Sequence, residues 1–293
     1  MEIPSSGYPP LSRYTTTLNV VLGYYGSAII FNFERFPNEK DFRKGSDKDV
    51  SLLKDLLDRA QMKTTIYKNL PKNEMLKQLQ KFAKSEDHLR GCMAFIFILS
   101  HGDRTSIDAS DGESVYLEEE IYPIFYHDNC PYLKGKPKNF VIQSCRGEKE
   151  QLGTFKDAKQ FYVSRIPLIP NVSDISVVYA SIPFYVSYRD VTGTWLIKSY
   201  TEELGAINEM DYEDREYKRL LMRVSQSVMK KSTHKGNCKT TIEIYYRGFD
   251  SLLYLPELLT IEELNEKQQK ERNDQDWFTR SLFGACTVSS SAF

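Results

Sequence analysis

Two short segments, each directly after an apolar run, hold the residues that could do covalent chemistry. His101 follows the run at 93–99 (MAFIFIL), and Cys145 follows the run at 140–142 (FVI). A thiol has an ordinary pKa of about 8.5 and an imidazole one of about 6.5, so contact between them favours a thiolate beside a proton donor. These residue types predict a cysteine nucleophile with a histidine general acid and base.

The two runs predict how residues so far apart along the chain could meet. Seven apolar residues without alternation at 93–99 are typical of a strand that is covered on both faces, and 140–142 has the same character. The carboxyl ends of parallel strands share one edge of a sheet, where ligand crevices form. We therefore expect His101 and Cys145 to face each other across that edge.

Neighbouring residues favour a site over a structural role for these positions. Taken alone, a cysteine after a buried strand is usually a small core residue, and a histidine there more often closes a strand end than catalyses. Gly102, however, leaves its backbone N–H unshielded, and with the Cys145 N–H it could stabilise a tetrahedral oxyanion. Gln143, Arg146 and Gly147 add polar groups and a sharp turn at the second strand end.

The segments 143–147 (QSCRG) and 100–102 (SHG) resemble the signature of the caspases, the aspartate-directed cysteine endopeptidases. That signature is Q-A-C-[RQG]-G with its histidine about 50 residues upstream, and Ser144 here replaces the alanine. The resemblance runs from about residue 26 to 255 and is closest to executioner-like, short-prodomain members, including those of insects. It implies that Cys145 is the nucleophile, that His101 is the general acid and base, and that the Gly102 and Cys145 amides form the oxyanion hole.

The resemblance also implies a pocket for an aspartate side chain, made by Arg43, Arg189 and Gln143. Guanidinium groups offer a bidentate fork that matches a carboxylate, and two of them with a neutral amide select a short acidic side chain. Without the resemblance, two surface ion pairs would be the simpler interpretation of the two arginines.

Further subsites follow from the same resemblance. Ser187 and Tyr188, with Arg189, match the strand that pairs with extended substrate, and Trp195 matches an aromatic wall of the fourth subsite. The alternative is that these aromatic residues belong to the core. A shortened loop between residues 231 and 240 leaves the preference beyond aspartate open.

Alternating strand and helix patterns predict an α/β fold. Specifically, we expect a caspase-like three-layer sandwich, with a central six-stranded, mostly parallel sheet flanked by helices. The predicted strands are 27–32, 64–67, 93–99, 140–142, 175–180 and 242–246, and the predicted helices are 49–61, 72–82, 195–204 and 212–229.

Composition excludes several classes of protein. The 293 residues carry 39 Lys and Arg against 40 Asp and Glu, which is unlike a basic nucleic-acid binder or an acidic disordered chain. No apolar stretch reaches the length of a membrane span. Five scattered cysteines predict free thiols and a cytoplasmic location, and without CxxC or HxxxH pairs we expect no metal and no cofactor.

The resemblance divides the chain into a short pro-segment (1–24), a large catalytic subunit (25–157), a small subunit (158–256) and a charged tail (257–293). Thr260 and Glu263 form a capping box that predicts a helix to residue 272 within the tail. The family is made as a zymogen, and Asp157 is the predicted processing site between the subunits. Expected partners are an upstream activating caspase, inhibitor-of-apoptosis proteins and protein substrates with an exposed aspartate.

Two functions stay open. The first is an active protease that cleaves after aspartate in apoptosis, and the residue types of the dyad and acid pocket favour it. The second is a caspase-like regulator, a decoy or an activator by dimerisation, which Ser144 and the charged tail favour. The resemblance further implies a homodimer of large and small subunit pairs, joined by the strand at 242–246 into a twelve-stranded sheet.

Overall fold

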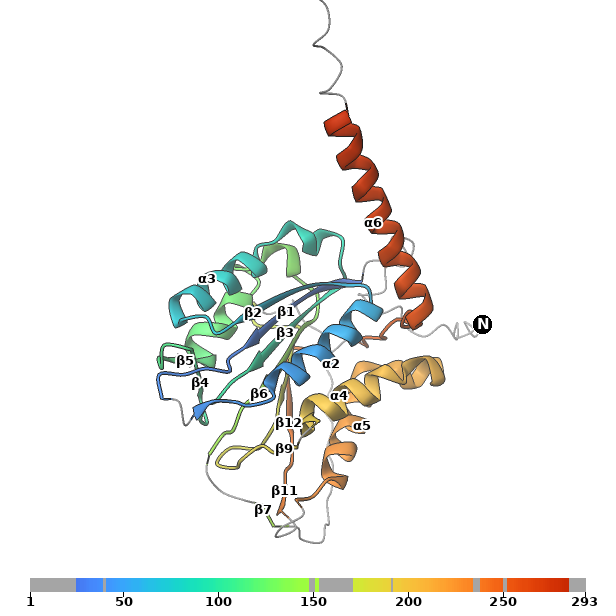
Figure 1. Ribbon diagram of the computed structural model, residues 1–293. Helices are drawn as coiled ribbons and strands as arrows, with labels where there is room; N and C mark the ends of the chain where they lie inside the picture. The colour runs from blue at the N-terminus through green and yellow to red at the C-terminus, as the bar shows by residue number, and fades with distance from the viewer. Residues whose placement is uncertain are drawn as a thin grey trace, which may run out of the picture.

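A six-stranded sheet, in the order β12-β8-β6-β3-β1-β2, forms the centre of the computed structural model (Figure 1). The structure describes residues 25–38, 41–147, 151–152, 171–190, 192–233, 238–249 and 252–284. The strands are β1 (Gly26–Asn32), β2 (Met62–Lys68), β3 (Met93–Leu99), β6 (Lys138–Gln143), β8 (Ile175–Tyr179) and β12 (Glu243–Arg247). All neighbours pair in parallel except β12, which runs antiparallel to β8 at the edge.

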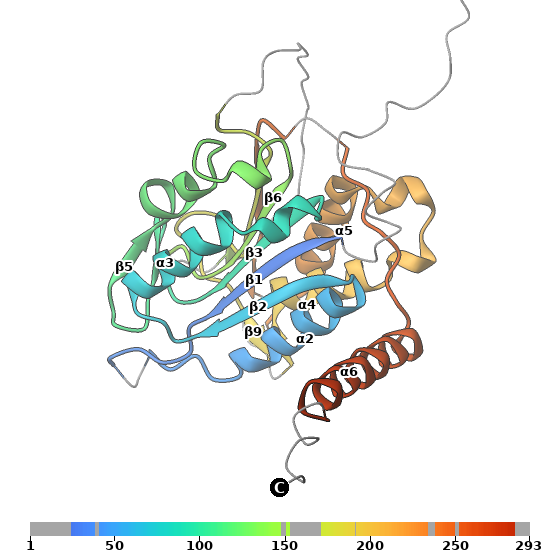
Figure 2. The same ribbon diagram turned by 90° about the horizontal axis from the view of Figure 1, so that it is seen from above.

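Helices cover both faces of this sheet, as Figures 1 and 2 show from two directions. One face carries α2 (Ser46–Arg59), α4 (Trp195–Gly205) and α5 (Tyr217–Lys230), and the other carries α3 (Lys72–Ala83) with several short helical turns. Those turns are Glu86–Leu89, Leu117–Ile121, Tyr122–Phe125 and Pro131–Leu133. The predicted three-layer α/β sandwich is confirmed.

The central strand β3 shows why an uninterrupted apolar run predicted burial on both faces. Successive side chains of a strand point to opposite sides. Phe95 and Phe97 accordingly lie in the core with α2, α4 and α5, while Ile96 and Ile98 lie in the core with α3. All seven residues of β3 are buried.

Among the residues that the structure describes, three two-stranded ribbons complete the strands. They are β4 (Ser106–Asp108) with β5 (Ser114–Tyr116), β7 (Gln151–Leu152) with β11 (Cys238–Lys239), and β9 (Arg189–Asp190) with β10 (Gly193–Thr194). Strand β7 lies within the connector 147–173, and its two residues pair with Cys238 and Lys239, which follow α5. Ser173, at the end of that connector, is buried.

The predicted helix 212–229 is divided in the structure. Tyr212–Arg215 is a 3₁₀ turn, Glu216 is extended, and α5 begins at Tyr217. The Glu216 carboxylate accepts a hydrogen bond from the Arg219 N–H at 3.0 Å, so Glu216 caps α5. The single-helix prediction was wrong because apolar spacing does not reveal a cap.

The predicted capping box is present at the start of the last helix, α6 (Ile261–Gly284). The Thr260 N–H donates to Glu263 Oε2 at 2.8 Å, and the Glu263 N–H donates to Thr260 Oγ1 at 3.2 Å. The helix continues past the predicted end at residue 272, because no glycine or proline interrupts it before Gly284. It extends away from the body of the molecule (Figure 1).

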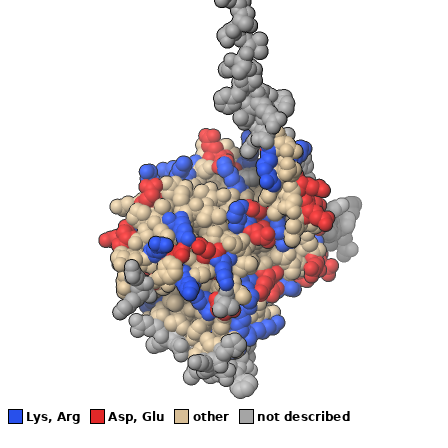
Figure 3. Space-filling model, viewed as in Figure 1, with Lys and Arg blue, Asp and Glu red and all other residues tan. Residues whose placement is uncertain are grey.

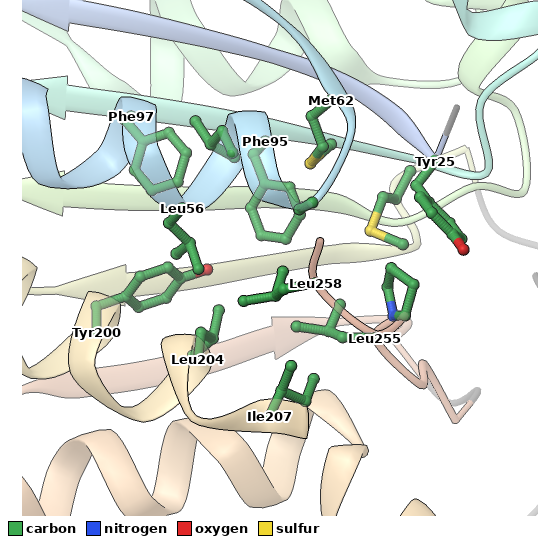
Figure 4. Close-up of a pocket in the computed structure, with 14 residues that line it drawn as sticks. Tyr25, Leu56, Met62, Phe95, Phe97, Tyr200, Leu204, Ile207, Leu255 and Leu258 are labelled. Carbon is green, nitrogen blue, oxygen red and sulfur yellow. The ribbon is translucent and has the colours of Figure 1, made fainter. Parts of the chain in front are cut away.

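A small apolar cavity of about 30 Å³ lies between the sheet, α2, α4 and the segment before α6 (Figure 4). Its lining includes Leu56, Phe97 and Leu204, and Leu258 closes one side. The lining exposes no polar surface, so the cavity offers no hydrogen-bond partner to a water molecule or a polar ligand.

Charge and hydropathy on the surface agree with the balanced composition. On the face in Figure 3, Lys and Arg are interspersed with Asp and Glu. None of the described helices is both long and apolar enough to span a bilayer. The four cysteines in the described part of the chain, Cys92, Cys130, Cys145 and Cys238, are free thiols.

Candidate active site

The register of β3 against β6 brings the two predicted reacting residues to one edge of the sheet. Leu99 and Gln143 are partners in this parallel pairing, and the Ser100 N–H donates to the Gln143 carbonyl at 3.1 Å. His101 and Cys145 each stand two residues beyond that pair. Neighbouring strands lie about 4.8 Å apart. The register therefore brings His101 and Cys145 to adjacent strand ends although they are far apart in the sequence.

His101 is half-buried, and its ring is held on two sides. Nε2 lies 2.6 Å from the Asp41 carbonyl oxygen, and the Phe36 ring centroid lies 4.8 Å from that of the imidazole. Because a carbonyl can only accept, Nε2 carries the proton, and Nδ1 keeps the lone pair of the neutral ring. Burial lowers the pKa of His101; the hydrogen bond to the Asp41 carbonyl opposes this shift, and the nearby Arg43 charge adds to it. The imidazole is therefore a neutral base at pH 7.

Cys145 is half-buried, and its sulfur contacts Ser187. Sγ lies 3.6 Å from Ser187 Oγ and receives the Ser187 N–H at 3.5 Å. Among the described residues no hydrogen bond joins Cys145 to His101. The imidazole bonds to Asp41 instead, and the Cys145 sulfur contacts Ser187. The structure thus brings the pair to one edge without a hydrogen bond between them.

Two backbone amides at this edge are free to stabilise an oxyanion. In the described part of the chain, neither the Gly102 N–H nor the Cys145 N–H donates a hydrogen bond. A Cβ on residue 102 would lie 2.4 Å from the Ser106 carbonyl oxygen, so only glycine allows the loop to close there. A Cβ on Gly147 would likewise lie 2.2 Å from the Phe184 backbone.

Arg43 lies beneath this edge and is almost fully buried. Its Nη1 donates to the Phe33 carbonyl at 2.6 Å, while Nη2 is buried without a hydrogen-bond partner among the described residues. Burial, followed by the positive charge of Arg189, lowers the pKa of Arg43 to about 9, and Asp49 and Cys145 oppose that shift. The guanidinium stays charged at pH 7 and has a donor to spare.

Arg189 and Gln143 approach the same place from other elements. Arg189, exposed on β9, donates from Nη1 to the Lys44 carbonyl at 3.0 Å, one residue from Arg43. Gln143, buried at the end of β6, donates from Nε2 to Ser187 Oγ at 3.0 Å, and Oε1 has no partner among the described residues. We call Arg43, Arg189 and Gln143 the acid pocket.

The predicted distal residues lie together but differ in exposure. The rings of Tyr188 and Trp195 are 4.9 Å apart, and the Trp195 N–H donates to the Tyr188 carbonyl at 3.0 Å. Trp195 begins α4 and is only 5% exposed, so it supports Tyr188 from the core side. Ser187 and Tyr188 belong to no strand, while Arg189 pairs with Thr194 in β10.

Two predictions concern features outside this edge. Asp157, the predicted processing site, lies outside the described residues. Within the described residues, no group of three His, Cys, Asp or Glu side chains could hold a metal ion.

Sequence reasoning missed two groups that hold the reacting segment. The Asp41 carbonyl fixes the His101 tautomer, but every residue has a carbonyl, so no residue type could have revealed it. Glu243 on β12 forms an ion pair with Arg146, and only the antiparallel edge pairing shows that these two residues meet.

Comparisons with known proteins show which family and which solved structures the chain is similar to. The family model described as "Caspase domain" matches residues 25–254. The chain is 31% identical to Caspase drICE of Drosophila melanogaster over 216 residues, covering 69% of this chain and 62% of that protein, so it spans under two thirds of that relative's length. It is 31% identical to Caspase-1 of Spodoptera frugiperda over 202 residues, covering 67% of this chain and 66% of that protein. The crystal structure of the Spodoptera caspase-1 superposes with a TM-score of 0.71 at 25% identity, covering 87% of this chain and 99% of that one.

Proposed function

The chain belongs to the caspase family of cysteine proteases, and on this premise we propose that it is an active endopeptidase that cleaves proteins after aspartate. One observation carries the proposal. The β3–β6 register places His101 and Cys145 equally far beyond a paired position, at the edge that also holds the acid pocket. A nucleophile, a neutral base and two spare donors for a carboxylate therefore meet at one place.

The chemistry follows from the groups at that edge. Nδ1 of His101 takes the thiol proton, and the Cys145 sulfur forms a bond to the backbone carbonyl carbon of the aspartate, at the peptide bond to be cleaved. The Gly102 and Cys145 amides donate to the oxyanion that develops. His101 then gives the proton to the leaving amine as the peptide bond breaks, and a water molecule hydrolyses the thioester. Rotation of the Cys145 side chain away from Ser187 precedes the first step, because Sγ contacts Ser187 in this structure.

Selection of aspartate follows from the charges of the acid pocket. Arg43 offers an unpaired buried Nη2, and Arg189 is exposed beside it. Rotation of the Gln143 amide exchanges Nε2 and Oε1, which would aim a neutral donor at a substrate carboxylate. Two guanidinium groups pairing one carboxylate favour a short acidic side chain over its uncharged amide.

The wider setting is part of the same proposal. The protein acts in apoptosis in the cytoplasm, where free thiols persist, and matures from a zymogen by cleavage after Asp157 into large and small subunits. Two such pairs form a homodimer through β12, the edge strand. An upstream caspase activates it, and inhibitor-of-apoptosis proteins are potential partners.

One observation favours the second function, a caspase-like regulator with little catalysis of its own. His101 bonds to Asp41 and Cys145 contacts Ser187, so the two reacting groups are not joined in this structure. We favour the protease because the acid pocket would have no use in a regulator that binds no substrate.

Mass spectrometry of the expressed protein tests the proposal. We expect the wild type to split after Asp157, and the Cys145→Ala variant to stay intact under the same conditions. An Asp157→Ala variant that still splits at that position would refute the processing site. A wild type that does not split by itself, and that turns over no peptide even after an added protease has cleaved the connector, would favour the regulator.

A further inference from the structure

A buried carboxylate lies beside the acid pocket. Asp49, in the first turn of α2, has no exposed surface, and its Oδ1 accepts the Thr194 N–H at 2.8 Å. Its Oδ2 is buried and has no hydrogen-bond partner among the described residues. Burying a carboxylate is costly unless neighbouring groups compensate it. Other groups must therefore compensate the cost of burying the Asp49 carboxylate.

The compensating charges are the arginines of the acid pocket. Burial raises the pKa of the Asp49 carboxyl, and the Thr194 amide and the guanidinium groups of Arg43 and Arg189 oppose that rise. Asp49 in turn favours the charged form of Arg43. Asp49 thus lies within electrostatic reach of both arginines that would meet a substrate carboxylate.

Arg189 stands on a ribbon with little support of its own. Strand β9 has two residues, both exposed, and it pairs only with the two residues of β10. Thr194 is the register partner of Arg189 in that pairing. An isolated two-stranded ribbon is marginally stable at best, so the position of Arg189 depends on what holds Thr194.

Asp49 contacts both residues of β10. Besides the Thr194 hydrogen bond, a Cβ on Gly193 would lie 2.8 Å from Asp49 Oδ1, which shows how closely the backbone approaches the carboxylate. Gly193 has a φ of 138°, which disfavours any other residue at this position. Asp49 on α2 is thus hydrogen-bonded to Thr194, and Thr194 is paired with Arg189.

We propose that Asp49 is a positioning residue for aspartate specificity, whose carboxylate fixes β10 and so sets the place of Arg189 in the acid pocket. The inference rests on the proposed function and deepens it. A fixed guanidinium fits one length of acidic side chain, whereas a mobile one also accommodates glutamate. Asp49 touches no substrate and takes no part in bond making.

Three variants separate this role from a general effect on folding. Asp49→Ala removes the acceptor, and Asp49→Asn removes the charge but keeps an oxygen for the Thr194 N–H. Asp47→Ala is the matched control, because Asp47 lies in the same helical turn but is exposed and pairs with Lys68. The readouts are KM and kcat for peptides ending in aspartate or glutamate, and hydrogen exchange of the Gly193 and Thr194 amides.

We expect Asp49→Ala to raise KM for the aspartate peptide about tenfold and to change kcat less than about twofold. Its preference for aspartate over glutamate should fall about tenfold, and the Thr194 amide should exchange about tenfold faster. Asp49→Asn should stay within about threefold of the wild type in KM, and Asp47→Ala should match the wild type.

Two results would overturn the inference. One is an Asp49→Ala protein with wild-type KM and wild-type amide exchange, and the other is an equal loss in Asp49→Asn and Asp49→Ala. If Asp49→Ala does not fold, a large rise of KM in folded Asp49→Asn overturns the role, and a wild-type KM supports it. A wild type without turnover refutes the proposed function instead, while amide exchange still decides whether Asp49 holds the ribbon.

Discussion

The guanidinium of Arg146, the residue after Cys145, donates a hydrogen bond to the carboxylate of Glu243 on the edge strand β12. The same guanidinium lies over the Tyr179 ring, 3.9 Å from its centroid. Arg146 is buried, so this pair ties the segment that carries the nucleophile to the outer strand of the sheet. Substitutions on β12 that break this pair should therefore alter the position of Cys145.

We expect Glu243→Ala to lower kcat/KM for an aspartate peptide about tenfold, because it leaves a buried guanidinium without its partner. Glu118→Ala is the control, since Glu118 pairs with Arg247 on the same strand but has no contact with the Cys145 segment. Steady-state kinetics on folded variants measure both. Equal activity of the two variants would show that the Arg146 pair does not support the site.

Substitution of the two arginines of the acid pocket should affect KM in both cases but stability in only one. Arg189→Ala should raise KM for an aspartate peptide about 10- to 100-fold at unchanged stability, because Arg189 is exposed. Arg43→Ala should raise KM similarly and also lower the urea midpoint, because Arg43 is buried and bonds to the Phe33 carbonyl. Wild-type KM in either variant would remove that arginine from the pocket.

Much of the fold was predictable because a strand that is buried on both faces consists of apolar residues. Residues 93–99 are apolar throughout and form β3 with the predicted bounds. The expected edge placement of His101 and Cys145 follows from that strand and β6, and the register confirms it. The chemistry assigned to these two residues stays a prediction, which rests on residue type, strand end and the family resemblance.

Other features were beyond sequence reasoning for physical reasons. The break at Glu216 depends on a side-chain cap, and the apolar spacing of 212–229 continues across it unchanged. The Asp41 carbonyl acts on His101 through a backbone atom that every residue has. Asp49 was hidden because an acidic residue in the first turn of a helix is ordinary, and only packing shows that it is buried against β10.

Gly102→Ala should reduce kcat at least tenfold, because the new Cβ would collide with the Ser106 carbonyl and displace an oxyanion donor. Gly205→Ala is the matched control, since a Cβ there meets no atom within 4 Å. Single-turnover rates at saturating peptide separate chemistry from binding. A Gly102→Ala protein with the wild-type rate would exclude this amide from the oxyanion hole.

Buried histidines make stability depend on pH below neutrality. Burial, followed by the charge of Lys138, lowers the pKa of His127, although Asp174 lies 3.4 Å from its Nε2. The unfolded state then binds more protons once pH falls below about 6.5, so folding stability is lost as pH decreases through that window.

Urea midpoints at pH 7.5 and 5.5 test this sign. The wild type should lose more stability between these two values than His127→Gln, which cannot be protonated in this range. An equal loss in both proteins would show that His127 is not responsible.

Turnover of acetylated tetrapeptides that differ only in a final aspartate or asparagine is the decisive test of aspartate-directed cleavage by Cys145 and His101. The wild type, Cys145→Ala and His101→Ala are compared after maturation. We expect rapid release from the aspartate peptide by the wild type, at least about 100-fold slower release from the asparagine peptide, and background rates for both variants. A wild-type rate no higher than that of Cys145→Ala, or equal rates on the two peptides, would contradict this expectation.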